Sequence, residues 1–134
     1  MIRPNVSVIM SVFNNEKTVS KSIESILSQK GLDFELLVID DCSTDKTYLE
    51  CKKYKEYKNF RLLKNDKNIG LTKSLNLLIE KTNGDFIARQ DGDDYSLENR
   101  LSEQYYFMLN KGFKVSYTMA KNLQTMKNFP RFRF

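Results

Sequence analysis

Between residues 5 and 110 the sequence repeats one pattern four times: a short, β-branched and apolar run is followed by apolar residues at helical spacing. The first run, residues 6–13, is mostly apolar at successive positions, which is typical of a strand buried on both faces. Val19, Ile23 and Ile26 then recur at i, i+4 and i+7, which predicts a helix with one buried stripe. Strands that alternate with helices predict right-handed crossovers. We therefore expect an α/β, Rossmann-like fold, with a parallel sheet of about four strands and helices on both faces.

The three later repeats predict strands at residues 34–39, 60–64 and 85–89. Helices are expected after each of these strands, the first of them, over residues 45–57, being the weakest. The same spacing predicts which helix residues face the core. These are Leu49, Tyr54, Leu71, Leu75, Leu78, Ile79, Leu97, Leu101, Tyr105 and Met108.

Charge divides the 134-residue chain at about residue 110. Residues 1–110 hold 16 basic and 17 acidic side chains, whereas residues 111–134 hold six basic side chains and no acidic one. We interpret residues 1–110 as one folded domain and residues 111–134 as a basic, aromatic tail with a short amphipathic helix at Met119, Leu123 and Met126. A nucleic-acid-binding protein carries its basic stripe on the folded core, so the near-neutral core argues against nucleic acid as a partner.

The tail has two interpretations. Its cations and aromatic rings suit peripheral contact with an anionic membrane surface, but a truncated or frame-shifted reading frame would look equally basic. No stretch approaches the roughly 20 apolar residues of a membrane span. Cys42 and Cys51 are expected to be free thiols in a reducing compartment. We therefore expect a cytoplasmic protein, with contact to the inner face of the membrane as an additional hypothesis for the tail.

Polar residues gather where each predicted strand ends, namely at residues 14–16, 40–45, 65–70 and 91–94. In an open parallel sheet, ligands bind outside the carboxyl ends of the strands. Any one polar loop is unremarkable, but four at the same sheet edge favour a binding site. The chain has no histidine, no GxGxxG and no GxxxxGK[ST] motif. Hydride-transfer enzymes, P-loop NTPases and histidine-based hydrolases are therefore disfavoured.

The acidic run at residues 91–94 places Asp91, Asp93 and Asp94 within four positions and contains no basic residue. Carboxylates at this spacing repel one another unless a cation joins them. Oxygen ligands favour a hard ion, and Mg²⁺ is usually held by one or two carboxylates together with substrate phosphates. The residues that follow do not match a calcium EF-hand loop. A metal site is therefore predicted here, with a solvated acidic turn as the alternative.

The loops after the second and third strands offer further polar contacts. Asp40 and Asp41 are suited to accept hydrogen bonds from a ribose or a base edge, or one of them caps the helix that follows. Asn68-Ile69-Gly70 precedes a helix whose amino end suits an anion.

These segments together resemble the family 2 glycosyltransferases, which have the GT-A fold. The matching segments are VSVIMSVFNNEKTVSKSIESILSQ, FELLVIDDCSTDKT, NDKNIGLTKSLN and GDFIARQDGDD, in the order and spacing of the family. They span about residues 5–104, which corresponds to the nucleotide-binding half of that fold.

The resemblance implies roles for individual residues. It implies a nucleotide site made of Phe13, Asn14, Glu16, Asp40, Asp41, Ser43, Asn68, Gly70, Lys73 and Asp91. It also implies that Asp91 and Asp93 bind Mn²⁺ or Mg²⁺, which bridges the diphosphate of the donor.

The implied reaction is metal-dependent, inverting transfer of a sugar from a nucleotide-diphosphate-sugar to an acceptor hydroxyl. The acceptor is expected to be a saccharide or lipid-linked, in bacterial polysaccharide or lipopolysaccharide synthesis. The family's carboxylate base normally lies in an acceptor-binding half further along, and residues 111–134 contain no carboxylate. We therefore expect a truncated enzyme, and the change in composition at about residue 110 fits a frame-shifted reading or a natural short protein as well. The alternatives are a non-catalytic remnant that binds nucleotide sugars or acts as an interaction module, and an unrelated flavodoxin-like binding domain.

Overall fold

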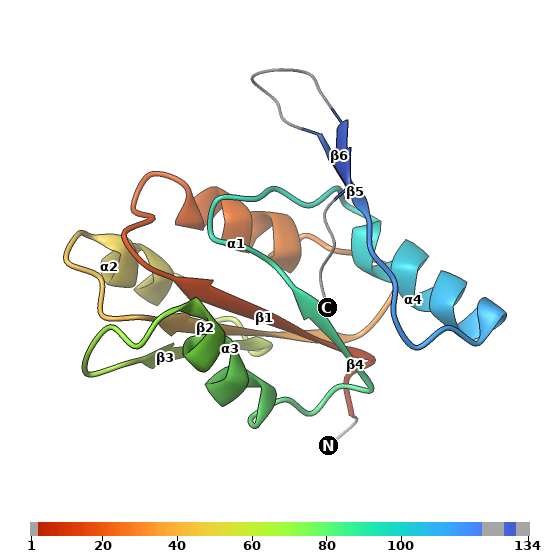
Figure 1. Ribbon diagram of the computed structural model, residues 1–134, viewed down its shortest axis with the longest axis horizontal. Helices are drawn as coiled ribbons and strands as arrows, with labels where there is room; N and C mark the ends of the chain where they lie inside the picture. The colour runs from red at the N-terminus through yellow and green to blue at the C-terminus, as the bar shows by residue number, and fades with distance from the viewer. Residues whose placement is uncertain (1–2, 122–127, 131–134) are drawn as a thin grey trace.

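The computed structural model describes residues 3–121 and 128–130, and its centre is a four-stranded parallel sheet (Figure 1). The strands are β1 (Val6–Val12), β2 (Phe34–Asp40), β3 (Phe60–Lys64) and β4 (Phe86–Arg89). The helices are α1 (Val19–Leu27), α2 (Thr47–Lys52), α3 (Leu71–Ile79) and α4 (Arg100–Lys111). The strand order is β3-β2-β1-β4 and every adjacent pair is parallel, which confirms the predicted fold class.

Alternation along β1 divides the hydrophobic core between the two faces of the sheet. Met10 belongs to a large buried cluster with Ile23 of α1 and Leu101 of α4. Ile9 points to the opposite face and belongs to a smaller cluster with Leu78 of α3. Helices α1 and α2 therefore lie on one side of the sheet and α3 on the other (Figure 1). Both faces of the central strands are covered, as expected for a parallel sheet.

The helical spacing identifies the core residues only in part. Among the predicted inward residues, those that are buried are Val19, Ile23, Ile26, Tyr54, Leu78, Leu101 and Met108. The prediction is wrong for Leu49 and Leu97, which are 58% and 76% exposed. Helix α2 is only six residues long and buries Thr47 and Cys51 instead, and Leu97 precedes the first residue of α4.

Leu71 and Ile79 of α3 are also more exposed than predicted, at 47% and 43%. Of the helices in the described part of the chain, α3 alone contributes to the core on its face of the sheet. No neighbouring helix therefore packs against the flanks of α3, and only its central stripe is buried.

A buried polar cluster closes the amino end of the sheet beside Gly84. The Glu35 carboxylate accepts hydrogen bonds from the Ser7 hydroxyl at 2.6 Å and from the Asn83 backbone N–H at 2.7 Å. The Ser7 hydroxyl in turn accepts a hydrogen bond from the Gly84 N–H at 2.8 Å. A Cβ atom on Gly84 would lie 2.5 Å from the backbone nitrogen of Ser7. The turn before β4 therefore packs directly on β1, with no space for a side chain.

The chain beyond α4 differs from its prediction. Gly112 ends α4 with a left-handed φ of +65°, a common way for a helix to terminate. Strands β5 (Met119–Lys121) and β6 (Asn128–Pro130) then pair antiparallel. The predicted amphipathic helix is wrong at Met119, which lies in β5, whereas Leu123 and Met126 lie outside the described residues. Within the described residues no helix is long and apolar enough to cross a membrane, and the longest, α4, has 12 residues.

Candidate functional site

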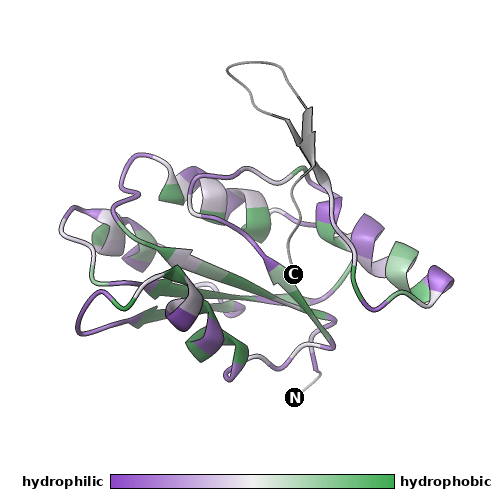
Figure 2. Cartoon of the chain, in the orientation of Figure 1, coloured by the Kyte–Doolittle hydropathy of each residue, from purple (hydrophilic) through white to green (hydrophobic). Residues whose placement is uncertain are grey.

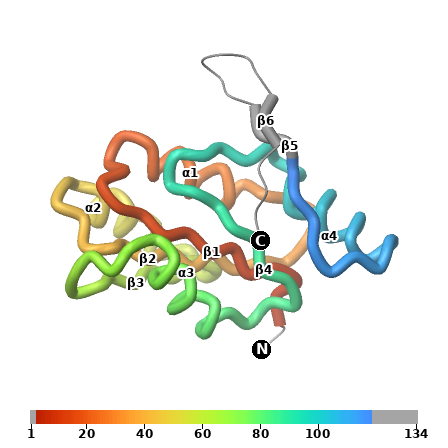
Figure 3. Tube along the Cα trace, in the orientation of Figure 1, coloured from red at the N-terminus to blue at the C-terminus, as the bar shows by residue number. Residues whose placement is uncertain are grey.

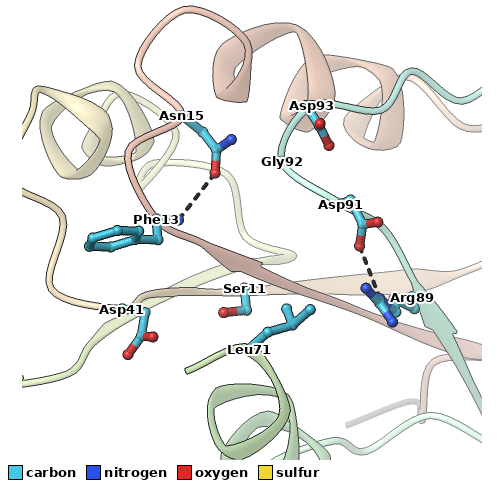
Figure 4. Close-up of a pocket in the computed structure, with 9 residues that line it drawn as sticks. All are labelled: Ser11, Phe13, Asn15, Asp41, Leu71, Arg89, Asp91, Gly92 and Asp93. Atoms are coloured by element: carbon cyan, nitrogen blue, oxygen red, sulfur yellow. Dashed lines mark hydrogen bonds and ion pairs between the residues drawn. The ribbon is translucent and has the colours of Figure 1, made fainter. Parts of the chain in front are cut away.

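A cavity of about 230 Å³ opens at the carboxyl edge of the sheet (Figure 4). Its lining residues are Ser11, Phe13, Asn15, Asp41, Leu71, Arg89, Asp91, Gly92 and Asp93. These residues come from the ends of β1, β2 and β4 and from the start of α3. The loops at this edge are mostly hydrophilic, whereas the strands between them are largely hydrophobic (Figure 2). The parallel sheet thus brings the polar strand ends together, as the sequence predicts.

Only part of the predicted site lines this cavity. The predicted residues in its wall are Phe13, Asp41, Asp91 and Asp93. Those outside the wall are Asn14, Glu16, Asp40, Ser43, Asn68, Gly70 and Lys73. Sequence reasoning missed Ser11, Leu71 and Arg89. Arg89 could have been predicted as a site residue, because it is a basic residue at a strand end, two positions before Asp91.

Several predicted site residues join the loop after β1 to the loop after β2. The Oδ1 atom of Asn14 accepts a hydrogen bond from the Thr44 N–H at 2.9 Å, and the Asn14 N–H donates to Ser43 Oγ at 3.0 Å. The Oε2 atom of Glu16 accepts from the Lys46 N–H at 3.0 Å. These reciprocal bonds fix the backbone of both loops. Contacts from Asn14, Glu16 and Ser43 to a nucleotide stay predictions.

The joined loops contain two non-glycine residues with left-handed backbone, Asn14 at a φ of 53° and Cys42 at 62°. Such conformations cost about 1–3 kcal/mol each and persist where the surroundings hold them. Asp45 contributes to that restraint by accepting hydrogen bonds from the Thr47 N–H at 2.9 Å and the Glu16 N–H at 3.1 Å. Burial alone would raise the pKa of Asp45, but these hydrogen bonds outweigh burial and lower it.

Asp41 lies at the cavity, and its carboxylate is bonded to the loop before α3. Its Oδ1 atom accepts hydrogen bonds from the Ile69 N–H at 2.9 Å and from the Asn65 amide at 2.8 Å. Its Oδ2 atom accepts from the Gly70 N–H at 2.8 Å. Burial alone would raise the pKa of Asp41, but these hydrogen bonds outweigh it and lower the pKa. Asp41 therefore fixes the loop that leads into α3 and does not cap α2, the helix that follows β2 directly.

We expect Asp41→Asn to destabilise the protein at pH 7 by about 1–3 kcal/mol. The NH₂ group of asparagine would face backbone N–H groups that donate hydrogen bonds to the Asp41 carboxylate, and at least one of these bonds would be lost. The folded-state pKa of Asp41 is lowered, so its ionised form stabilises the fold above about pH 4. That contribution is lost as the pH falls through the lowered pKa. Urea unfolding of wild type and variant at pH 7 and pH 3 measures the difference, which should shrink on acidification. The exposed Asp33→Asn serves as the control, and a difference for Asp41→Asn that is constant with pH would refute this account.

Asp40 points away from the cavity, towards α2. It is completely buried, and its Oδ2 atom accepts a hydrogen bond from the Ser43 N–H at 3.2 Å. Burial, and then the Asp40 carboxylate nearby, raises the pKa of the Cys51 thiol to about 12. Asp40 therefore lies beside a protonated, buried thiol of α2, and its contact with a nucleotide stays a prediction. The same holds for Asn68, Gly70 and Lys73, on the loop before α3 and on α3 itself.

The acidic run after β4 has a basic partner that the sequence prediction did not assign. The Nε atom of Arg89 donates to Oδ1 of Asp91 at 2.9 Å (Figure 4). The expectation that a bound cation alone relieves the repulsion among these carboxylates is therefore corrected, because the guanidinium relieves part of it. A Cβ atom on Gly92 would lie 2.8 Å from Cγ1 of Val12, so the loop passes close to β1 between Asp91 and the exposed Asp93.

Polar side chains on α1 and just beyond its end hold this acidic loop in place. The Ser22 hydroxyl donates to the Asp91 carbonyl at 2.7 Å, and Ser25 Oγ accepts from the Ser96 N–H at 3.0 Å. Gln29 donates to the Leu97 carbonyl at 2.6 Å. The segment from residue 90 to residue 99 accordingly runs alongside α1 (Figure 3). Sequence reasoning missed this function, although buried serines at a spacing of three residues interrupt the apolar stripe of α1.

The carboxylates at the cavity fit a hard divalent cation whose remaining coordination positions are filled by a bound ligand. Among the described residues there is no group of three or more His, Cys, Asp or Glu side chains placed to hold a metal ion. The cavity wall does carry the carboxylates of Asp91 and Asp93 on one loop. Mg²⁺ is usually held by one or two carboxylates plus substrate phosphates, so two carboxylates are a sufficient protein contribution.

A parallel sheet with helices on both faces and a polar cavity at its carboxyl edge defines an open α/β, Rossmann-like domain, in which ligands bind at that edge. The family model for glycosyl transferase family 2 matches residues 7–129 of the chain. The chain belongs to this family. The resemblance carried by its motifs is thereby confirmed.

Relatives and solved structures agree with this assignment. EpsE of Bacillus subtilis is 47% identical over 107 residues, which cover 78% of this chain and 38% of EpsE. WfgD of Escherichia coli, named as UDP-Glc:alpha-D-GlcNAc-diphosphoundecaprenol beta-1,3-glucosyltransferase, is 36% identical over 84% of this chain and 44% of its own. S. aureus TarS 1-349 in complex with UDP-GlcNAc has a TM-score of 0.73 at 30% identity, over 78% of this chain and 31% of that TarS chain.

A more distant structure shares the fold over a larger part of the chain. Mannosyltransferase PcManGT from Pyrobaculum calidifontis, in complex with GDP-Man and Mn²⁺, has a TM-score of 0.77 at 19% identity, over 94% of this chain and 38% of its own. The chain therefore spans less than half the length of each relative described here.

Proposed function

We propose that these residues form the donor-binding half of a metal-dependent, inverting glycosyltransferase of bacterial polysaccharide or lipopolysaccharide synthesis. The observation that carries the proposal is the cavity at the carboxyl edge, where Asp91 and Asp93 meet the ends of β1 and β2. Family membership supports it, as do relatives that are named for nucleotide-sugar substrates or bound to them. The acceptor is proposed to be a saccharide or a lipid-linked sugar.

The cavity wall accommodates part of the donor. A volume of about 230 Å³ is smaller than the roughly 300–1,000 Å³ of pockets that enclose a whole small molecule. We assign the enclosed part to the diphosphate and the adjoining sugar atoms, beside Asp91, Asp93 and Ser11. The ring of Phe13, which is 44% exposed, offers an apolar surface for the nucleoside. A bound Mn²⁺ or Mg²⁺ supplies charge neutralisation for the departing nucleoside diphosphate.

Sugar transfer also needs a base for the acceptor hydroxyl. Loss of general-base assistance typically costs about 10²–10⁴ in rate, and loss of acceptor positioning costs more. We propose that residues outside this 134-residue sequence supply both functions in a complete enzyme. The second candidate function is binding of a nucleotide sugar without transfer.

A thermal-shift series with UDP, GDP and their sugar nucleotides tests the donor-binding proposal. A ligand at 100 times its Kd adds about 2.7 kcal/mol of stability, which corresponds to a rise in Tm of roughly 10 °C for a domain of this size. We expect this rise for at least one nucleoside diphosphate with Mn²⁺ and a much smaller one with EDTA. The matching nucleoside monophosphate is the control, because it lacks the phosphate that a metal would bridge. Equal shifts with Mn²⁺ and with EDTA would overturn metal-dependent binding.

A further inference from the structure

Arg89 occupies the boundary between the sheet and the acidic loop. Its partner in the register of β1 is Ile9, so its side chain lies on the face of the sheet that α3 covers. Its guanidinium lines the cavity and its Nε atom donates to Asp91 Oδ1 at 2.9 Å (Figure 4). Among the described residues that line the cavity, Arg89 supplies the one cationic group, against the carboxylates of Asp41, Asp91 and Asp93.

The charges of this cavity conflict with the ligand assigned to it. The cavity wall contains three acidic residues, and the proposed function places a diphosphate beside them, so negative charge would lie on both sides. Arginine is suited to phosphate, because its planar guanidinium presents several N–H donors in a fixed geometry. Arg89 already lies at the cavity wall.

The ion pair between Arg89 and Asp91 is well placed for an exchange of partners. Both side chains keep about 30% of their surface exposed, and ion pairs with that degree of solvent contact contribute little net stability. If the pair served only to stabilise the fold, a buried arrangement would be expected, like that of Glu35 at the other end of the sheet. A weak pair at a cavity wall can change partners at small cost.

We propose that Arg89 binds the diphosphate of the donor, and that Arg89 pairs with Asp91 until the donor binds. This inference rests on the proposed function. Before the donor binds, Arg89 neutralises Asp91 and reduces the repulsion within the acidic loop. When Asp91 turns to a divalent cation, Arg89 leaves the carboxylate and pairs with a phosphate oxygen of the donor. Arg89 thereby couples donor binding to metal binding, because its guanidinium serves one anion or the other.

The test compares Arg89→Met with wild type in two titrations, Mn²⁺ alone and then UDP or GDP at saturating Mn²⁺. The nucleotide is the one with the larger wild-type thermal shift. We expect Mn²⁺ alone to bind Arg89→Met at least as tightly as wild type, because no guanidinium competes for Asp91. We expect the nucleoside diphosphate to bind about 10- to 100-fold more weakly, the size expected for a charged hydrogen bond. Arg89→Lys should recover part of this loss.

The matched control is Arg61→Met, because Arg61 is also a strand arginine on the α3 face and pairs with Glu35 at 3.7 Å, away from the cavity. It should leave both titrations unchanged. If Arg89→Met weakens Mn²⁺ and nucleotide alike, Arg89 only positions Asp91 and the inference is overturned. Unchanged nucleotide affinity overturns it as well, while the proposed function stands. If wild type binds no nucleoside diphosphate, the proposed function and the inference both fail.

Discussion

Asp93→Asn is expected to weaken nucleoside diphosphate binding in the presence of Mn²⁺ by about 100-fold, while the stability of the fold changes little. Loss of a group that only orients a metal ligand typically costs 10- to 100-fold in metal affinity, so loss of a direct ligand should reach the upper end. Asp93 lines the cavity and is exposed. Its carboxylate makes no hydrogen bond or ion pair within the described part of the chain, so folding does not depend on it.

Isothermal titration of the nucleotide into wild type and variant, with Mn²⁺ and with EDTA, measures this effect. Asp85→Asn is the matched control, because it makes the same charge change at the opposite end of β4, where Asp85 pairs with Arg3 at 3.1 Å. Wild type and Asp93→Asn should bind the nucleotide with equal affinity in EDTA. A variant that binds as tightly as wild type with Mn²⁺ would show that Asp93 is not a metal ligand.

Gly84→Ala is expected to destabilise the protein by about 3 kcal/mol, the upper end of the range for overpacking a tight site. The added Cβ would lie 2.5 Å from the Ser7 nitrogen and 2.8 Å from the Val6 carbonyl carbon, both backbone atoms of the central strand β1. Relief of this contact requires the turn to move away from β1. That movement would break the hydrogen bond from the Gly84 N–H to the Ser7 hydroxyl, which itself donates to the buried Glu35 carboxylate.

Gly112→Ala provides the comparison, because among the described residues no atom outside its own helix end and chain neighbours lies within 4 Å of the added Cβ, so only the left-handed φ of +65° is penalised. We expect this control to cost about 1 kcal/mol. Urea denaturation at pH 7 gives both values. If the two glycine variants have the same midpoint, close packing at Gly84 does not limit stability.

The sequence was most informative about the fold. Its alternation of apolar runs and helical stripes predicts β1 to β4 and their parallel arrangement, because the crossover rule leaves few topologies. It was less informative about which helix residues are buried. Leu49 lies inside α2, but that helix buries Thr47 and Cys51 instead, and Leu97 lies before the first residue of α4. The apolar spacing alone therefore does not show which face of a short helix is buried or where a helix begins.

For the site, position could be predicted more readily than role. Parallel strands place Asp41 and Asp91 at one edge, and the structure places both in one cavity wall. The roles of Asn14 and Asp41 depend on which backbone N–H groups lie beside them, about 30 residues away in sequence for Thr44 and Ile69. Such long-range hydrogen bonds leave no local pattern. For this reason a motif can show where a site lies before it shows which side chains are free to bind.

The interlocked loops have a consequence for how this domain can change its donor. Residues whose side chains join the loops, such as Asn14 and Glu16, belong to the framework, and their substitution would shift several backbone segments together. Ser11, Phe13 and Leu71 line the cavity from outside that network. We therefore expect laboratory evolution towards a new nucleotide or sugar to accumulate its substitutions at these three positions first. Substitutions at these three positions would change the surface that contacts the donor and leave the hydrogen bonds between the two loops in place.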